Sequence, residues 1–105
     1  MKILFDQGTP APLRRSLVGQ AVDTAYELGW STFKNGELID AAEKKGYDLL
    51  ITTDQALRYQ QNLTARKIAI IVLMTTDWRR IQTRVEEIKR AIDLIAIGGY
   101  VEVPI

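Results

Sequence analysis

The fold is decided by the stretch Ile68-Ala69-Ile70-Ile71-Val72-Leu73, an unbroken apolar run rich in β-branched residues. A run without polar alternation is typical of a strand that is covered on both faces of its sheet. Two comparable runs lie upstream, at Ile3–Phe5 and Asp48–Thr52. The segments between the runs contain apolar residues at helical spacing. Strands that alternate with helices predict parallel pairing through right-handed crossovers. We therefore expect an α/β fold, a three-layer α/β/α sandwich around a mostly parallel sheet of about five strands.

The segments between these runs predict the remaining elements. They are a helix that Thr9-Pro10 begins and Gly19 ends, a second strand within residues 21–27, a loop over 30–34, a helix capped by Asn35 and stopped by Gly46, and a short helix over 56–61. The strongest helical pattern follows Thr76 or Asp77, one of which is the expected cap; its stripe is Ile81, Val85, Ile88, Ile92 and Ile95, and Gly98-Gly99 ends it. Tyr100–Val103 alternates before Pro104, which predicts an edge strand.

Composition narrows the chemistry that this chain can perform. Its 105 residues predict a single domain over 1–105, and 14 basic against 13 acidic side chains leave a net charge of only +1. No bulk field therefore draws the protein onto nucleic acid or membrane. Cysteine and histidine are both absent, which excludes disulfides, thiolate or imidazole metal ligands, and Ser-His-Asp triads. Any metal must be a hard cation held by oxygen.

The chain also lacks the features of a membrane or secreted protein. Its longest apolar run, residues 68–74, is far shorter than the roughly 20 residues that cross a bilayer. The opening stretch Met1–Asp6 reaches an acidic residue before a signal-length apolar segment develops. We expect no membrane insertion and a cytoplasmic location.

Three acidic residues are the candidate functional side chains. Asp6 and Asp54 follow two of the predicted buried strands, and Glu37 lies in the first turn of a helix that begins on the same side of the sheet. Ligands of open parallel sheets bind outside the carboxyl ends of the strands, so the three carboxylates are expected to converge. Clustered carboxylates suit Mg²⁺ or Mn²⁺. Each also has a structural interpretation: a turn for Asp6, a helix cap for Asp54 and a helix-dipole contact for Glu37.

The sequence resembles the small PIN-like domains related to toxin ribonucleases, specifically a compact group classed as a domain of unknown function. The opening block Met1–Asp6 with Pro10 matches that group, as do Glu27–Ser31, Asn35–Ile39 after a loop of matching length, and Leu49–Leu57. The resemblance covers about the first two thirds of the chain. It implies a metal-dependent endoribonuclease in which Asp6, Glu37 and Asp54 hold Mg²⁺ or Mn²⁺ and perform catalysis. RNA, an antitoxin protein and a second copy of the chain are the implied partners.

Two alternatives remain open at this point. Gln7, Thr53 and Ala56 depart from the pattern of the group, two of them where it has further acids, which favours a catalytically weakened or inactive PIN-like interaction module. A receiver-like phosphoacceptor domain also has acids after the first and third strands. It usually has paired acids after the first strand and a lysine after the fifth, whereas this chain has Asp6-Gln7 and ends in Pro104-Ile105.

Overall fold

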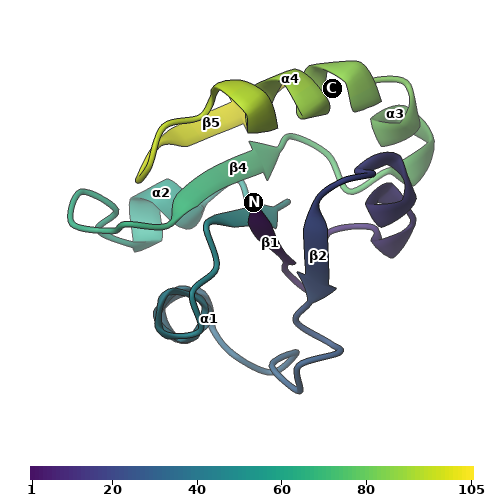
Figure 1. Ribbon diagram of the computed structural model, residues 1–105. Coiled ribbons are helices and arrows are strands. Elements are labelled where there is room, and N and C mark those ends of the chain that lie inside the picture. The colour runs from purple at the N-terminus through teal and green to yellow at the C-terminus, as the bar shows by residue number, and fades with distance from the viewer.

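Five parallel strands form the centre of the computed structural model, which describes residues 1–105 (Figure 1). They are β1 (Lys2–Phe5), β2 (Ala21–Thr24), β3 (Leu49–Thr52), β4 (Ala69–Leu73) and β5 (Tyr100–Val103). Their order in the sheet is β2-β1-β3-β4-β5, and every neighbouring pair is parallel. The expected α/β sandwich is confirmed, with a sheet that is parallel throughout and with β5 at an edge.

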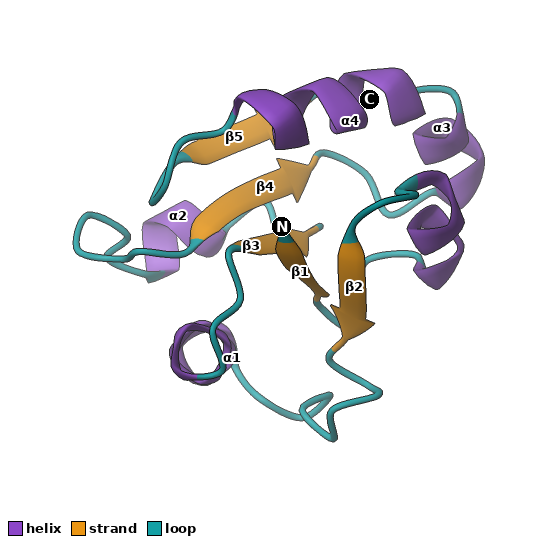
Figure 2. Ribbon diagram, viewed as in Figure 1, coloured by secondary structure: helices purple, strands orange, loops and turns teal.

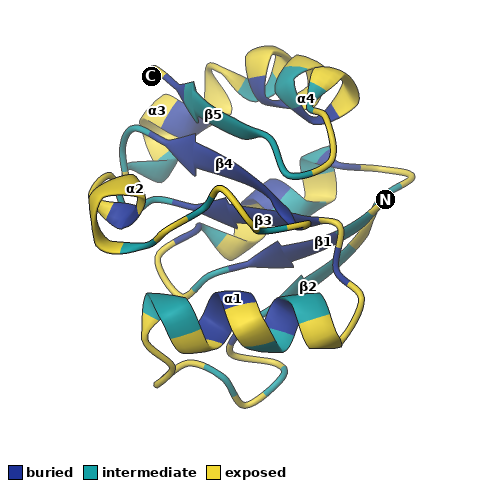
Figure 3. Ribbon diagram, turned by 90° about the vertical axis from the view of Figure 1, so that its left-hand side faces the viewer, coloured by how far each residue is buried: buried dark blue, intermediate teal, exposed yellow.

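Helices cover both faces of this sheet (Figure 2). One layer contains α1 (Asn35–Lys44) and α2 (Leu57–Gln60); the other contains the 3-10 helix η1 (Ala11–Ser16), α3 (Trp78–Gln82) and α4 (Val85–Leu94). Successive strand residues point to opposite faces, so Leu4 packs with the α1 layer while Ile3 and Phe5 pack with the η1 layer. Figure 3 shows the buried strands between helices whose outer surfaces are exposed.

The long helix expected after Asp77 is two helices, which corrects the sequence-based prediction. Asp77 caps α3 by accepting a hydrogen bond from the backbone N–H of Arg79 at 3.0 Å. At the break, the hydroxyl of Thr83 donates to the carbonyl of Arg80 at 2.7 Å. A threonine that bonds the backbone of its own helix competes with the regular hydrogen-bond ladder. The apolar stripe is retained, because residues of both helices pack on the same core.

The helix expected after Thr9-Pro10 is also different. It forms as the 3-10 helix η1, and Pro10 is its N-cap residue without a side-chain capping bond. Thr9 instead directs its hydroxyl toward Asp6, as described below. No helix is long and apolar enough to span a bilayer.

The strand order defines where a ligand is expected. After β1 the chain places β2 on one side and β3 on the other, so the connectivity changes direction between β1 and β3. The crevice outside the carboxyl ends at such a switch point is the usual ligand site of an open parallel sheet. Asp6 and Asp54 follow these two strands.

Glu43 ties the end of α1 to the start of β4. Its carboxylate accepts from Arg66 Nη1 at 2.8 Å and from the backbone N–H of Lys67 at 2.8 Å. Burial raises the pKa of Glu43, but the bonds from Arg66 and the backbone outweigh it and leave the pKa below its usual value. The ionised carboxylate therefore contributes stability above the unfolded-state pKa, and this contribution is lost as the pH falls through the folded-state pKa.

We expect Glu43→Gln to lower the free energy of unfolding at pH 7 by about 1–3 kcal/mol, since the amide cannot accept from both donors. Urea titration at pH 7 and at pH 3 measures the effect, which should shrink at the lower pH. The control is Glu86→Gln, because the Glu86 side chain is 81% exposed and bonds only Lys89 at 3.8 Å. Equal losses in both variants would contradict the structural role of Glu43.

Candidate acidic site at the carboxyl edge of the sheet

Asp6 lies directly after β1, with its carboxylate between two threonine hydroxyls. Oδ1 is 2.6 Å from Oγ1 of Thr9, and Oδ2 accepts a short hydrogen bond from Thr52. The backbone N–H of Asp6 donates to the carbonyl of Ile51 at 3.1 Å, which fixes the residue to the end of β3. The turn that follows is tight, because a Cβ on Gly8 would lie 2.6 Å from Oγ1 of Thr53. Sheet pairing and turn geometry together set the position of this carboxylate.

The surroundings of Asp6 favour its protonated form. Oγ1 of Thr9 lies 2.6 Å from Oδ1 of Asp6 and 2.8 Å from the carbonyl oxygen of Ile51, yet a hydroxyl donates only one hydrogen bond. When Asp6 carries a proton, it donates to Thr9 and Thr9 donates to Ile51, so all three oxygens are satisfied. Partial burial also raises the pKa of Asp6, because it disfavours the charged form. Hydrogen bonds from Thr52 and Thr9 oppose that increase. A proton on Asp6 therefore satisfies the hydrogen bonding of this site.

Asp54 follows β3 and is joined to Asp6 through Thr52. The hydroxyl of Thr52 accepts from the backbone N–H of Asp54 at 3.1 Å while it donates to Asp6. Oδ1 of Asp54 accepts from the backbone N–H of Ala56 at 3.0 Å, and Oδ2 accepts from the side-chain amide of Asn35. Asp54 thus both shapes the turn before α2 and contacts the start of α1.

Asn35 is the site residue that the sequence analysis missed. It was expected to cap α1, but the N-cap residue is Lys34, and Asn35 is the first residue of the helix. Its side-chain amide donates to Asp54 and lies 3.4 Å from Oε1 of Gln60. No sequence signal distinguishes these two uses, because Asn is a common capping residue.

Glu37 lies on the same helix turn as Asn35, but its carboxylate has another partner. Oε1 accepts from the backbone N–H of the N-cap residue Lys34 at 3.0 Å, and the side chain is exposed. No group of three or more acidic side chains lies close enough to hold one ion. The structure therefore connects Asp6 with Asp54 and places Glu37 on the adjacent helix, turned toward Lys34.

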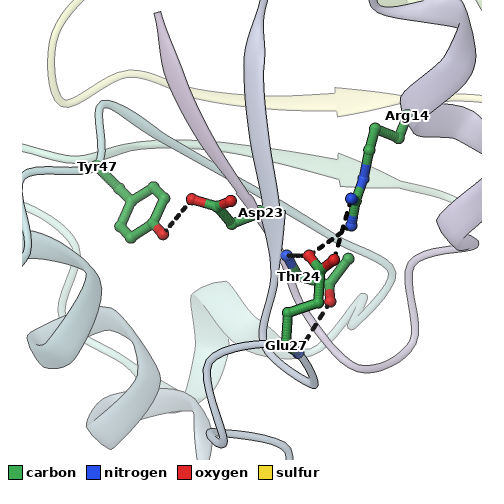
Figure 4. A network of polar contacts seen from close by, with 5 residues as sticks. All are labelled: Arg14, Asp23, Thr24, Glu27 and Tyr47. Atoms are coloured by element: carbon green, nitrogen blue, oxygen red, sulfur yellow. Dashed lines mark hydrogen bonds and ion pairs between the residues drawn. The ribbon is translucent and has the colours of Figure 1, made fainter.

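An open hollow of about 710 Å³ adjoins Asp6. The β1–η1 loop, the end of β2 and the start of α3 form its walls. Across one wall, Arg14 reaches Glu27 with two bonds of 3.1 and 2.6 Å, and Glu27 also accepts from the backbone N–H of Thr24 (Figure 4). The Arg14 hydrogen bond is the main reason that the pKa of Glu27 falls to about 2. The pair stays ionised and mutually neutralised at any ordinary pH.

The donor set at the switch point suits a hard divalent cation. Asp6 and Asp54 supply carboxylates, and the hydroxyl oxygens of Thr9 and Thr52 lie beside that of Asp6. Oxygen ligands of this kind bind Mg²⁺ or Mn²⁺. A cation at Asp6 would also offset the cost of ionising a half-buried carboxylate. The fit is to a site with two carboxylates, because Glu37 is engaged at Lys34.

The aromatic residues of the loop before α1 pack on each other and on the core. The rings of Trp30 and Phe33 are stacked with centroids 5.8 Å apart, and Trp30 meets Tyr47 edge-on at 6.5 Å. The hydroxyl of Tyr47 in turn donates to Asp23 at 2.6 Å on β2 (Figure 4). Tyr47 therefore links the aromatic residues of this loop to β2.

No family model, curated protein or solved structure matches this chain.

Proposed function

We propose that this protein is a PIN-like, divalent-metal-dependent endoribonuclease in which Asp6 and Asp54 hold Mg²⁺ or Mn²⁺. One observation carries the proposal. The two acids follow β1 and β3, the neighbouring strands between which the chain connectivity reverses, and Thr52 links them directly. The half-buried Asp6 also has a raised pKa, which a bound cation would reverse.

The residues of the site have separate tasks in this proposal. When bound, the ion supplies an activated water and neutralises charge on the leaving oxygen, which requires no histidine. Thr9 and Thr52 hold the Asp6 carboxylate in place, and Asn35 holds that of Asp54. Glu37 becomes a third ligand only if it gives up its capping bond to Lys34. Toxin activity restrained by an antitoxin protein is the biological role that fits such an enzyme.

Asp54→Asn tests the proposal against a matched control, Asp77→Asn. Both aspartates follow a strand and accept a backbone hydrogen bond two residues on, but only Asp54 lies at the switch point. We expect Mn²⁺-dependent cleavage of single-stranded RNA to fall at least ~100-fold in Asp54→Asn and to be unchanged in Asp77→Asn. Loss of cleavage in Glu37→Gln would add Glu37 to the ligands. Absence of cleavage in the wild-type protein, with no rise in Tm on adding Mn²⁺, would contradict the proposal.

A non-catalytic interaction module is the second candidate, and the hydrogen bonding favours it. All four side-chain oxygens of Asp6 and Asp54 already have hydrogen-bond partners within the protein, and Glu37 serves as a cap. Such a module binds an antitoxin protein, RNA or a second copy without cleaving. The receiver-like alternative has the matching strand order, but β5 runs into Pro104-Ile105 and supplies no lysine. Failure of a small phosphodonor to label Asp54 would exclude it.

A further inference from the structure

We propose that the hollow beside Asp6 binds one base of a single-stranded RNA, with Tyr26 and Trp78 as its aromatic contacts. This inference rests on the proposed function, because it assigns the nucleotide next to the phosphate that the Asp6 site would hold. Neither the acidic residues nor the resemblance to PIN-like domains assigns a role to this hollow.

The size and position of the hollow suit a nucleoside. Its volume of about 710 Å³ falls within the usual range of small-ligand sites, roughly 300–1,000 Å³. It opens beside Asp6 and extends toward the end of β2 and the start of α3, where Tyr26 and Trp78 line it. A nucleoside attached to a phosphate at Asp6 therefore has room on the side of the site that faces β2.

The charges in the hollow favour a neutral group over a second phosphate. Arg14 is the one basic residue in its lining, and both terminal nitrogens of that guanidinium bond Glu27. Figure 4 shows Arg14 turned toward Glu27 beside Thr24. Its lining also includes two exposed, uncharged polar residues, Gln7 with a side-chain amide and Thr76 with a hydroxyl. An amide donates and accepts, which suits the hydrogen-bonding edge of a base.

Tyr26 is the aromatic side chain available to stack. It is 73% exposed, and its hydroxyl has no protein hydrogen bond. Tyr47 and Tyr100 differ, because their hydroxyls bond Asp23 and Glu102. Trp78 is half-buried, and it packs partly against the core that η1 and α3 share. Stacking of a base on an exposed aromatic ring is how proteins bind unpaired nucleotides, and a paired base does not present its face.

The test measures RNA binding without catalysis. Trp30→Phe leaves Trp78 as the single tryptophan, so its fluorescence reports the hollow. With EDTA present to prevent cleavage, we expect saturable quenching by a single-stranded tetranucleotide and none by a short RNA duplex. Tyr26→Ala should weaken the affinity ~10-fold or more, as expected for the loss of one base-stacking contact. Tyr59→Ala is the matched control, since Tyr59 is 75% exposed and lies on α2, away from the hollow.

Two outcomes overturn this inference: no quenching, or an equal loss of affinity in Tyr26→Ala and Tyr59→Ala. If Trp30→Phe does not fold, anisotropy of a labelled tetranucleotide in the Trp30-containing protein gives the same comparison. The same measurements distinguish a missing base site from a missing nuclease activity. Binding that depends on Tyr26, without Mn²⁺-dependent cleavage, supports the base site and rejects the nuclease. Cleavage without an effect of Tyr26→Ala on binding rejects the base site alone.

Discussion

Asp6→Asn should melt at a higher temperature than the wild-type protein in metal-free buffer at pH 8. Its amide oxygen can accept from Thr52, and its amide nitrogen can donate to Thr9, which then donates to Ile51. Every hydrogen bond of the protonated acid is reproduced without a partly desolvated charge. We expect a gain of about 4–8 °C in Tm, the shift that roughly 1 kcal/mol produces in a domain of this size.

The pH dependence of this gain follows from the raised pKa of Asp6. A pKa above the unfolded-state value of 3.8 means that the stabilising contribution of Asp6 is complete below pH 3.8 and is lost as the pH rises through the folded-state pKa. Asn retains the neutral state at every pH. The difference in Tm between Asp6→Asn and wild type should therefore be near zero at pH 3 and largest at pH 8, as differential scanning calorimetry can measure.

Divalent metal should reverse the order of the Tm values of the wild-type protein and Asp6→Asn. We expect Mn²⁺ to raise the Tm of the wild-type protein and to leave Asp6→Asn unchanged, since metal that binds only the folded state stabilises it. Cleavage should fall at least ~100-fold in the same variant. A variant that is less stable than wild type without metal would contradict our account of Asp6. It would show that the carboxylate is ionised and well compensated by its threonines.

Thr52→Val should destabilise the protein by about 2–4 kcal/mol. Valine has nearly the shape of threonine, so no cavity forms at this position, which is 1% exposed. The substitution removes the donor to Oδ2 of Asp6 and the acceptor of the Asp54 N–H, and each buried polar group left unpaired costs about 1–3 kcal/mol. Urea titration measures the change directly.

Thr53→Val provides the control for the neighbouring position. Thr53 is half-buried, and its hydroxyl has no protein hydrogen bond. We expect its free energy of unfolding to change by less than ~0.5 kcal/mol, as is usual away from structural networks. If the two variants behaved alike, the effect would belong to β-strand packing and not to the link between Asp6 and Asp54.

The layered architecture was predictable because its signal is local. The apolar runs of β1, β3 and β4 need burial on both faces, and only a parallel sheet with helices on each side supplies it. Helix boundaries were less predictable, since the break at Thr83 depends on a single hydrogen bond from its hydroxyl to the carbonyl of Arg80. The apolar stripe is the same for one helix or two.

The candidate site was predictable only in outline. Topology places Asp6, Asp54 and the start of α1 on one side of the sheet, and the contact of Asn35 with Asp54 confirms that placement of the helix. The hydrogen-bond partners of the individual side chains were not predictable. Glu37 and Asn35 both have local and long-range bonding options of similar strength, and the pattern of residues does not reveal which one each side chain takes. The convergence of all three acids on one cation stays a prediction.

The bridge from Asp6 to Thr52 also governs when the site exists. These residues are 46 positions apart, and β1 needs β3 as a neighbour before Thr52 can bond Asp6. Closing so long a loop is slow relative to helix formation. A ribosome-bound chain that has not yet released β3 therefore lacks the hydrogen bonds that join Asp6 to Asp54 through Thr52, and a newly made molecule acquires them only when β1 and β3 pair.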